Sequence, residues 1–578
     1  MTNLVLRCIA IPYSSIIILI NLVFSAVAQS NSPPGINLPP DVRDPIEETN
    51  TEPFTPTPPE TPQPTPEEIL PDTSVQELPP ECQIPSESDR ISIKNIEVKG
   101  PTVLQTEIAE LIEPFQNRPL TSEELLCLPA LIEKLYINNG YITSGAFLTN
   151  SYLADGNATI QVIEGEIEEI KILGLEHLKP GYVRSRLELA TQKPLNRDEL
   201  EETLRLLQLN PLLKKVDADL QAGIGLGGNV LVVELDETSR WNVGLSGSNG
   251  QSPSTGELQG TVFLSNRNLL GIGDHFSAQY GFTEGLNSYS LGYTIPFTPR
   301  DTTFSVRYSN NDSNIIDEDF VKLGIRSESE TLSVNLRHPI INKPNSELGL
   351  SLGLDLRRSQ TFILDDIPFS FSEGPEDGAS KVTVIRFSQD WVDRSSPERI
   401  IAARSQFSFG IDAFGATIND IGTDGRFFSW LGQLQLVQKL SPRIVLVAGV
   451  NAQLTPDSLL SLEQFSLGGA DTVRGYRQNQ LVADNGILGT MEVRIPVTSD
   501  PIILQVVPFF DIGSAWNNDN SDLEPGLIAS LGLGLRGQIG SNFNWRLDYG
   551  LPLVDIENEG NSLQEQGLHF SLTYQVQF

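Results

Sequence analysis

The chain ends in the stretch HFSLTYQVQF (residues 569–578), in which polar and apolar side chains alternate without interruption. In an extended strand, successive side chains point to opposite faces. The apolar face of this stretch carries Phe570, Leu572, Tyr574, Val576 and Phe578. The period of two therefore predicts a β-strand with one apolar face and one polar face.

Similar stretches fill the chain from Arg240 to its end, and helical patterns are absent from this region of the sequence. The connections after the even-numbered strands are short, as in SPR (441–443), whereas most connections after the odd-numbered strands are longer and polar. Sixteen strands are predicted, near residues 241–249, 256–265, 273–282, 286–297, 301–309, 329–338, 345–357, 382–392, 401–413, 425–440, 443–454, 486–497, 503–515, 527–539, 543–551 and 567–578.

This sorting of short and long connections, together with an even number of strands, is typical of a bacterial outer-membrane β-barrel. Sixteen strands enclose a lumen too wide for side chains to fill. We therefore expect a mainly β fold, in which residues 239–578 form a 16-stranded antiparallel transmembrane β-barrel around an aqueous channel. A secreted all-β protein such as an adhesin is the alternative.

Two patterns precede the first folded region. In residues 1–28, Arg7 stands before an apolar run and the small residues Ala-Val-Ala, which predicts a cleaved secretory signal peptide. A retained membrane anchor is the alternative. Residues 29–81 are proline-rich and acidic, with 15 prolines and 11 carboxylates between positions 31 and 81. Such a segment cannot bury a core, so we expect an extended, disordered linker rather than a docking motif.

Residues 82–238 contain an internal repeat. IEVKGP (96–101) returns as IKILGL (170–175), and NRPLTSEELLCLPALIEKL (117–135) returns as QKPLNRDELEETLRLLQLN (192–210). The repeat predicts two small α/β modules, each with the order strand, helix, helix, strand, strand. We expect the first module at 82–166 and the second at 167–238. Helix N-caps are expected at two positions that each precede a glutamate by three residues, Thr121 and Asn196.

Composition argues against several functions. The net charge of -35 disfavours a nucleic-acid partner, since phosphate binding depends on clustered Lys and Arg. Residues 223–228 match GxGxxG, but predicted strands flank the motif on both sides, which indicates a hairpin turn and not a nucleotide site. The four histidines at 177, 275, 338 and 569 belong to no catalytic or metal-ligand grouping. We expect no enzymatic activity, no cofactor and no metal.

Three cysteines are present, and Cys8 is lost with the signal peptide. In an oxidising compartment the other two, Cys82 and Cys127, are candidates for a disulfide. Two free thiols are the alternative.

The stretch LGGADTVRGY (467–476) places Arg474 among glycines in the long sixth outer loop. In the thirteenth strand, Asp511 shares one face with Phe509 and Gly513. A charge that faced lipid would cost a few kcal/mol, so this face should point into the lumen. We expect loop six to fold into the pore, with Arg474 paired to Asp511 through two hydrogen bonds. Two unrelated solvated charges are the alternative.

Two motifs carry a resemblance to a known superfamily, the POTRA-plus-barrel outer-membrane transporters. They are VRGY in loop six, at Val473, Arg474, Gly475 and Tyr476, and F-x-D-x-G in strand thirteen, at Phe509, Asp511 and Gly513. Two modules before a 16-stranded barrel resemble the two-partner secretion (TpsB) transporters of the haemolysin secretion/activation (ShlB/FhaC/HecB) branch. The stretch SNRNLLGIGD (265–274) is similar to the early barrel strands of that branch. The resemblance covers the chain from Cys82 onward.

The resemblance implies a location and a mechanism. The barrel would lie in the lipids of the outer membrane, with the POTRA modules in the periplasm. These modules would capture an unfolded large partner exoprotein, TpsA-like, which crosses the barrel and folds outside. Candidate capture edges are the strands near 143–148, 159–163 and 170–173. The role expected for the Arg474–Asp511 pair is to hold loop six in a conformation competent for secretion.

The resemblance also implies that the barrel assembly machinery reads the terminal aromatic residue, Phe578. Several members of the family begin with a helix that plugs the pore, where this chain has its proline-rich acidic segment. The alternative functions are a BamA-like assembly factor for outer-membrane proteins and a passive porin.

Overall fold

A computed structural model describes residues 90–149, 156–318, 320–499, 501–519, 523–556 and 560–578. The expected signal peptide (1–28), the expected linker (29–81) and Cys82 lie outside the described residues. In these described ranges, no helix is both long enough and apolar enough to cross a membrane.

The first module has a three-stranded sheet with two main helices. The sheet order is β2-β5-β4. The central strand is β5, the last strand of the module in the sequence, and it is parallel to β2 and antiparallel to β4. A short antiparallel pair, β1 with β3, was not predicted from the sequence. The elements are β1 (Arg90–Ile93), β2 (Asn95–Lys99), α3 (Gln105–Ile112), η3 (Glu113–Phe115), β3 (Arg118–Thr121), α4 (Ser122–Asn138), β4 (Gly145–Leu148) and β5 (Asn157–Ile163).

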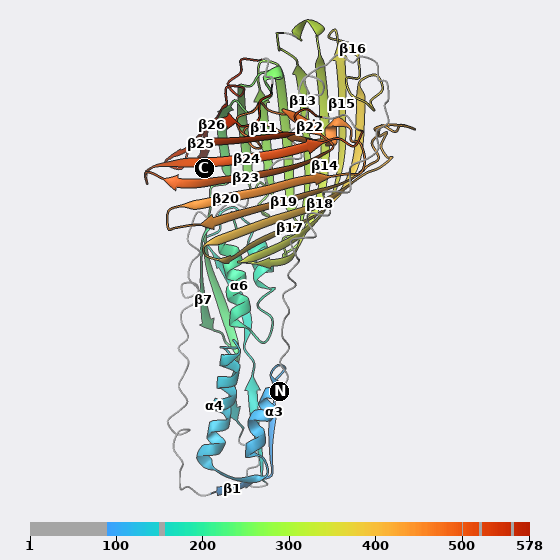
Figure 1. The fold of residues 1–578 in the computed structure, drawn as a ribbon. Coiled ribbons are helices and arrows are strands. Elements are labelled where there is room, and N and C mark those ends of the chain that lie inside the picture. Colours follow the sequence, from blue (N-terminus) through green and yellow to red (C-terminus); the bar gives the residue numbers. More distant parts are fainter. Residues whose placement is uncertain (1–89, 150–155, 319, 500, 520–522, 557–559) are drawn as a thin grey trace, which may run out of the picture. The chain divides into compact units, whose positions relative to one another are not determined.

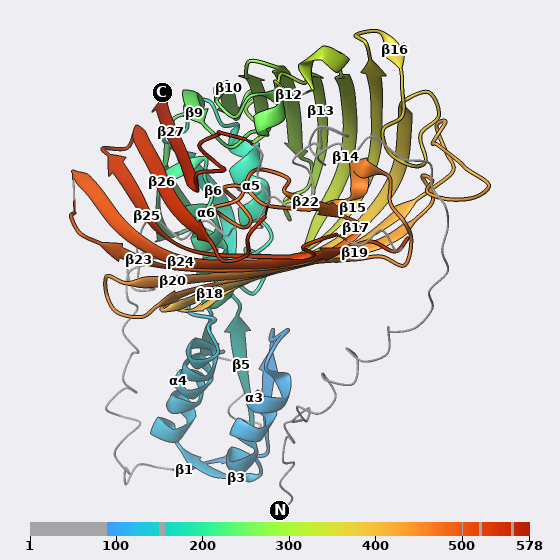
Figure 2. The ribbon, with the colours of Figure 1, turned by 45° about the horizontal axis from the view of Figure 1, so that its top comes forward.

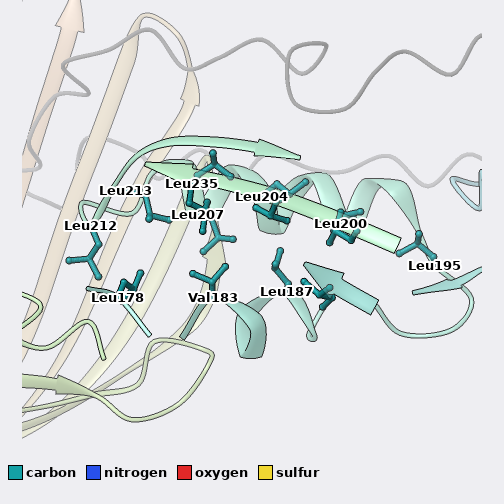
Figure 3. Packing of buried hydrophobic residues seen from close by; sticks show 14 residues of the cluster. Leu178, Val183, Leu187, Leu195, Leu200, Leu204, Leu207, Leu212, Leu213 and Leu235 are labelled. Carbon is teal, nitrogen blue, oxygen red and sulfur yellow. The ribbon is translucent and has the colours of Figure 1, made fainter. Parts of the chain in front are cut away.

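The second module repeats this arrangement in the sheet order β6-β8-β7. Its central strand is β8, which is parallel to β6 and antiparallel to β7. Its elements are β6 (Glu166–Leu173), α5 (Pro180–Leu187), α6 (Arg197–Gln208), β7 (Leu213–Ala222) and β8 (Gly228–Glu237). Figure 3 shows the side chains that form its core, among them Val183 and Leu187 of α5 and Leu204 of α6. The core is separate from that of the first module.

The predicted helix caps are present in both modules. The side chain of Thr121 accepts a hydrogen bond from the Glu124 N–H at 3.1 Å, and the Glu124 carboxylate accepts from the Thr121 N–H at 2.9 Å. Asn196 Oδ1 accepts from the Asp198 N–H at 2.9 Å. These bonds satisfy backbone donors that the first helical turn leaves free, and so define where α4 and α6 begin.

In each module, a glutamate at the end of the central strand binds the turn that follows the edge strand β2 or β6. Glu164 accepts hydrogen bonds from the Thr102 N–H at 2.7 Å and the Tyr136 hydroxyl at 2.9 Å. Glu237 accepts three backbone N–H bonds, from residues 176, 177 and 178, at 2.8, 2.9 and 2.8 Å. The two modules therefore share this contact as well: in both, a glutamate binds the backbone of the turn after β2 or β6.

In the described residues from Trp241 onward, sixteen long antiparallel strands close into a barrel, and the two-residue strand β16 (Ile367–Pro368) pairs with the end of β15. Figures 1 and 2 show the arrangement of the barrel strands. The predicted number of strands is confirmed. The strands are β9 (Trp241–Ser248), β10 (Gln259–Arg267), β11 (His275–Phe282), β12 (Leu286–Pro296), β13 (Thr303–Asn314), β14 (Arg326–Lys343), β15 (Ser346–Ile363), β17 (Ala379–Ser396), β18 (Arg399–Gly410), β19 (Phe428–Lys439), β20 (Val445–Leu454), β23 (Asn485–Pro496), β24 (Ile502–Trp516), β25 (Leu527–Ile539), β26 (Phe543–Pro552) and β27 (Leu568–Gln577).

The barrel closes where its last strand pairs with its first. Residues 571–577 of β27 pair antiparallel with residues 242–248 of β9. Beyond this ladder, Trp241 and Phe578 exchange two backbone hydrogen bonds, both of 3.0 Å. The final residue therefore extends the seam by one more bonded pair.

Three strands exceed their predicted lengths most, since β14, β15 and β17 each contain 18 residues. A transmembrane strand needs only about 9–11 residues, so these strands continue beyond the hydrocarbon layer. β14 begins with RSESET (326–331), which carries no apolar side chain. An apolar–polar alternation cannot mark such a segment, which explains why the predicted strand began later.

Candidate functional site

Loop six, residues 455–484, joins β20 to β23 and carries its own small hairpin. The hairpin pairs β21 (Phe465–Leu467) with β22 (Leu481–Ala483), and the short helix η7 (Ser461–Glu463) precedes it. The loop packs against inward-facing residues of the barrel wall through a buried apolar cluster. Its members are Phe465, Leu467, Val473, Tyr476, Leu481, Ala483, Leu488, Ala515 and Ile528. Loop six is thus a packed element inside the barrel and does not extend into solvent.

Arg474 forms the predicted pair with Asp511. Its Nε donates to Asp511 Oδ2 at 2.7 Å and its Nη2 donates to Asp511 Oδ1 at 2.9 Å. The Arg474 backbone N–H also donates to Asp511 Oδ2, at 3.3 Å. Arg474 is 4% exposed and Asp511 is 0% exposed, so water screens this ion pair very little. The structure therefore places a two-bond ionic contact between the tip of loop six and β24.

The other two residues of the strand motif make room for the loop and cover it. The guanidinium carbon of Arg474 lies 3.6 Å from the centre of the Phe509 ring, which accounts for an aromatic side chain on the inward face. A Cβ at Gly513 would lie 2.8 Å from the Leu467 side chain. Any larger residue there would displace the loop-six hairpin.

The glycine and tyrosine of the loop motif contact the last three strands, β25, β26 and β27. Gly475 has φ +97°, and a Cβ there would lie 2.9 Å from the backbone of Gly550. Its N–H donates to Nε2 of His569 at 2.9 Å. The buried Tyr476 hydroxyl donates to the Ala529 carbonyl at 2.8 Å. The motif VRGY is therefore bound along its whole length to the barrel wall.

Two acidic partners of Arg474 were missed in the sequence. Arg474 Nη1 donates to Glu492 Oε2 of β23 at 3.1 Å and lies 3.9 Å from Asp548 Oδ2 of β26. Each acid shares an inward face with an arginine two positions away in its own strand, which was the available signal. The ionic network comprises Arg474, Asp471, Glu492, Arg494, Asp511, Arg536, Arg546 and Asp548.

The network holds loop six against three strands of the barrel wall. Removing one partner of a buried ion pair typically costs about 3–5 kcal/mol, because the other charge stays buried without compensation. Loop six is therefore fixed to β23, β24 and β26 by contacts that only a concerted movement breaks. Within the described ranges, no three His, Cys, Asp or Glu side chains are grouped so that they could hold a metal ion.

The remaining predicted site residues lie elsewhere. Cys127, on α4, takes part in a disulfide, and its predicted partner Cys82 lies outside the described residues. The side chain of Phe578 is 66% exposed on the barrel.

The prediction of capture edges was partly wrong. The segment 159–163 belongs to β5, which is central in its sheet because β2 and β4 flank it on either side. A strand bonded on both sides offers no backbone groups to a client. β4 and β6 do lie at sheet edges, so the segments 143–148 and 170–173 stay candidates.

Comparisons with known proteins agree with this architecture. The model of the family "Haemolysin secretion/activation protein ShlB/FhaC/HecB" matches residues 227–537, and the model "POTRA domain, ShlB-type" matches residues 91–165. The outer membrane transporter CdiB of Escherichia coli O6:K15:H31 is 24% identical over 494 residues, which are 82% of this chain and 81% of that protein. The heme/hemopexin transporter protein HuxB of Haemophilus influenzae is 23% identical, over 80% of this chain and 83% of its own length.

A solved structure of CdiB from Escherichia coli has a similar fold. It superposes with a TM-score of 0.66 at 22% sequence identity and covers 87% of this chain and 94% of its own. CdiB from Acinetobacter baumannii gives a TM-score of 0.60 at 17% identity, with 88% and 94% covered.

Proposed function

Because the chain belongs to the haemolysin secretion/activation (ShlB/FhaC/HecB) family, we propose that its loop six controls the export of a partner protein through the barrel. The chain is an outer-membrane transporter of the two-partner secretion type, with its POTRA modules in the periplasm. The observation that carries the proposal is the burial of Arg474 against Asp511 inside the barrel. A client polypeptide has to share the lumen with this loop, so the position of the loop sets the width of its path.

The proposed client is a large secreted exoprotein that is unfolded during transit. The names of two relatives refer to different cargo, heme/hemopexin for HuxB and hemolysin for HpmB. Capture through main-chain hydrogen bonds could serve different clients. A client segment that binds as an extra strand at a sheet edge uses its backbone, so its side-chain sequence matters little. The edge strands β4 (Gly145–Leu148) and β6 (Glu166–Leu173) are the proposed capture sites.

The proposal includes three further roles. The outward apolar side chains of the strands, such as Leu245, Leu291 and Leu533, would contact outer-membrane lipids. The exposed ring of Phe578 would be read by the barrel assembly machinery during insertion. Folding of the client outside the cell would give transport its direction without catalysis by this chain.

The test is secretion of the partner protein. The chain is produced in a Gram-negative host together with a candidate exoprotein, and the exoprotein in the culture medium is measured. Export should depend on the chain and should fall in Arg474→Ala. Arg358→Ala is the matched control, since Arg358 forms an exposed ion pair of 3.2 Å with Glu330 away from loop six. A well-inserted wild-type barrel that exports no candidate exoprotein from a neighbouring gene would contradict the proposal.

A further inference from the structure

A second ionic contact holds the stem of loop six, on a different part of the barrel wall from Arg474. Its centre is Glu463, the last residue of η7. Glu463 is only 2% exposed, although the loop that carries it has many polar residues. A buried carboxylate requires compensating cations or hydrogen bonds, and here two arginines supply them.

The two arginines come from neighbouring strands, β15 and β17. Arg386 Nη2 donates to both carboxylate oxygens of Glu463, at 2.8 and 2.9 Å. Arg357 Nη1 donates to Glu463 Oε1 at 2.9 Å and also to the Leu462 carbonyl. Arg357 is itself 2% exposed. The side chain and the backbone of the stem are therefore bound at the same point.

Arg386 is also bound to the barrel wall, independently of the loop. Arg386 Nε donates to Asp355 Oδ2 at 2.5 Å, and its Nη1 donates to Ser408 Oγ at 2.7 Å. These partners lie on β15 and β18, so the wall itself orients the guanidinium toward the lumen. A preoriented cation forms a stronger contact because less side-chain freedom is lost on binding.

Two further contacts support the stem. Leu459, Leu460 and Leu462 form a buried cluster with Val382 and Val384 of β17 and with Phe427 of the fifth outer loop. Gln453 Nε2 donates to the Glu463 carbonyl at 2.9 Å and to the Asp484 carbonyl at 3.1 Å. The second of these bonds ties the two ends of loop six together.

The two anchors lie on opposite sides of the point where the loop leaves the wall. Along the barrel the strand order is β15-β17-β18-β19-β20-β23-β24-β25-β26, and loop six leaves between β20 and β23. Glu463 reaches back to β15 and β17, whereas Arg474 reaches forward to β23, β24 and β26. Loop six is therefore bound to the wall at two separate places, through Glu463 and through Arg474. Breaking the contacts at one place leaves those at the other intact.

We propose that Glu463 is a second anchor of loop six, a positioning residue that must leave Arg357 and Arg386 before the channel can open. The inference rests on the proposed function of loop six as the element that controls export. It adds that opening requires ionic contacts to break in two places, at the stem and at the tip. The stem contact then limits how far the loop moves when the tip alone is released.

The experiment measures loop movement and channel activity in the purified full-length protein, with no client present. Ser466 of β21 is buried, so a Ser466→Cys variant reports displacement of the stem by reaction with a maleimide. Glu463→Gln should raise this labelling rate roughly tenfold or more, because two guanidinium groups lose their carboxylate. Channel openings in planar bilayers should become more frequent. Glu463→Asp keeps the charge and should give an intermediate result.

The matched control is Asp390→Asn. Asp390 is also buried and pairs with Arg404 at 2.7 Å, but this pair joins β17 to β18 within the wall. The control should label and conduct like the parent protein. Equal labelling and equal channel activity in the parent and a folded Glu463→Gln barrel would overturn the second anchor.

Two other outcomes distinguish failure of the stem anchor from failure of the proposed function of loop six. If Glu463→Gln does not insert, unchanged labelling in the inserted Glu463→Asp protein overturns the anchor instead. If Glu463→Gln opens the channel but Arg474→Ala leaves export unchanged, the stem anchor stands and the proposed function of loop six fails.

Discussion

The guanidinium of Arg474 lies over the ring of Phe509, with 3.6 Å between the guanidinium carbon and the ring centre. The same guanidinium binds Asp511 through Nε and Nη2 within its own plane. A planar cation that is bound both at its edge and on its face has one favourable orientation. Lysine has neither the plane nor the fork, which is the physical reason for arginine at this position.

Replacing the ring should loosen the tip of loop six. A desolvated cation–π contact contributes about 2 kcal/mol. We therefore expect Phe509→Leu to raise the frequency of channel openings in planar bilayers by roughly tenfold or more, since each 1.4 kcal/mol changes an equilibrium about tenfold. Phe510→Leu is the control, because Phe510 is the next residue of β24 and points to the opposite face. Equal effects of the two variants would exclude a specific role for the ring.

Removing the cation should separate export from assembly. We expect Arg474→Ala to lower export of the partner while barrel levels stay near normal, with some assembly loss from the unpaired buried Asp511. Adding Asp511→Asn should restore the barrel level without restoring export. Immunoblots of outer membranes and of culture medium measure the two quantities. Unchanged export in the folded single variant would remove this ion pair from the mechanism.

Gly475 should tolerate no side chain, for two reasons that can be separated. Its φ of +97° strains any L-residue, and its Cβ position lies 2.9 Å from the Gly550 backbone. Strain of this kind alone costs about 1–3 kcal/mol. Gly415→Ala is the control, because Gly415 has φ +76° but no neighbour within 4 Å of a Cβ. Heat-modifiability on gels and export should both suffer more in Gly475→Ala, and equal effects would argue against crowding.

The first module should lose stability in acid. Burial disfavours the charged form of Glu164, but hydrogen bonds from Thr102 and Tyr136 outweigh it and lower the pKa of this carboxyl from its ordinary value. The unfolded carboxyl titrates near pH ~4.3, so the stabilisation is complete above that pH. It is lost as the pH falls further, through the lowered pKa of the folded state.

Urea unfolding of the fragment 82–238 measures this effect, because each module has its own core, from which we expect it to fold without the barrel. Glu164→Gln should lower the free energy of unfolding at pH 7 by about 1.5–3 kcal/mol and flatten its dependence on pH below 5. Glu97→Gln is the control, since Glu97 forms only an exposed pair of 3.2 Å with Lys99. A wild-type fragment that is equally stable at pH 3 and pH 7 would contradict the role of Glu164.

Several elements could be predicted because their signals are local. Alternation along each strand gave the number of strands but not all of their ends; β14, for example, begins at Arg326 in a polar segment, three residues before its predicted start. The repeat gave both modules, whereas the pairing of β1 with β3 carried no repeated pattern and was missed. The segment 159–163 lies in the centre of its sheet because of the order in which the strands pair. The sequence of one strand does not indicate its neighbours, so this position could not be predicted.

The sequence by itself determined the barrel, the two modules and the pairing of Arg474 with Asp511, since periodicity and two short motifs specify them. Only the tertiary structure decided that Glu492 and Asp548 join that pair, and that Glu463 meets Arg357 and Arg386. These charges lie on strands as much as 106 residues from the loop residue that they bind. They meet because closure of the barrel turns alternate residues of every strand toward one lumen, where a buried charge is stable only beside an opposite charge.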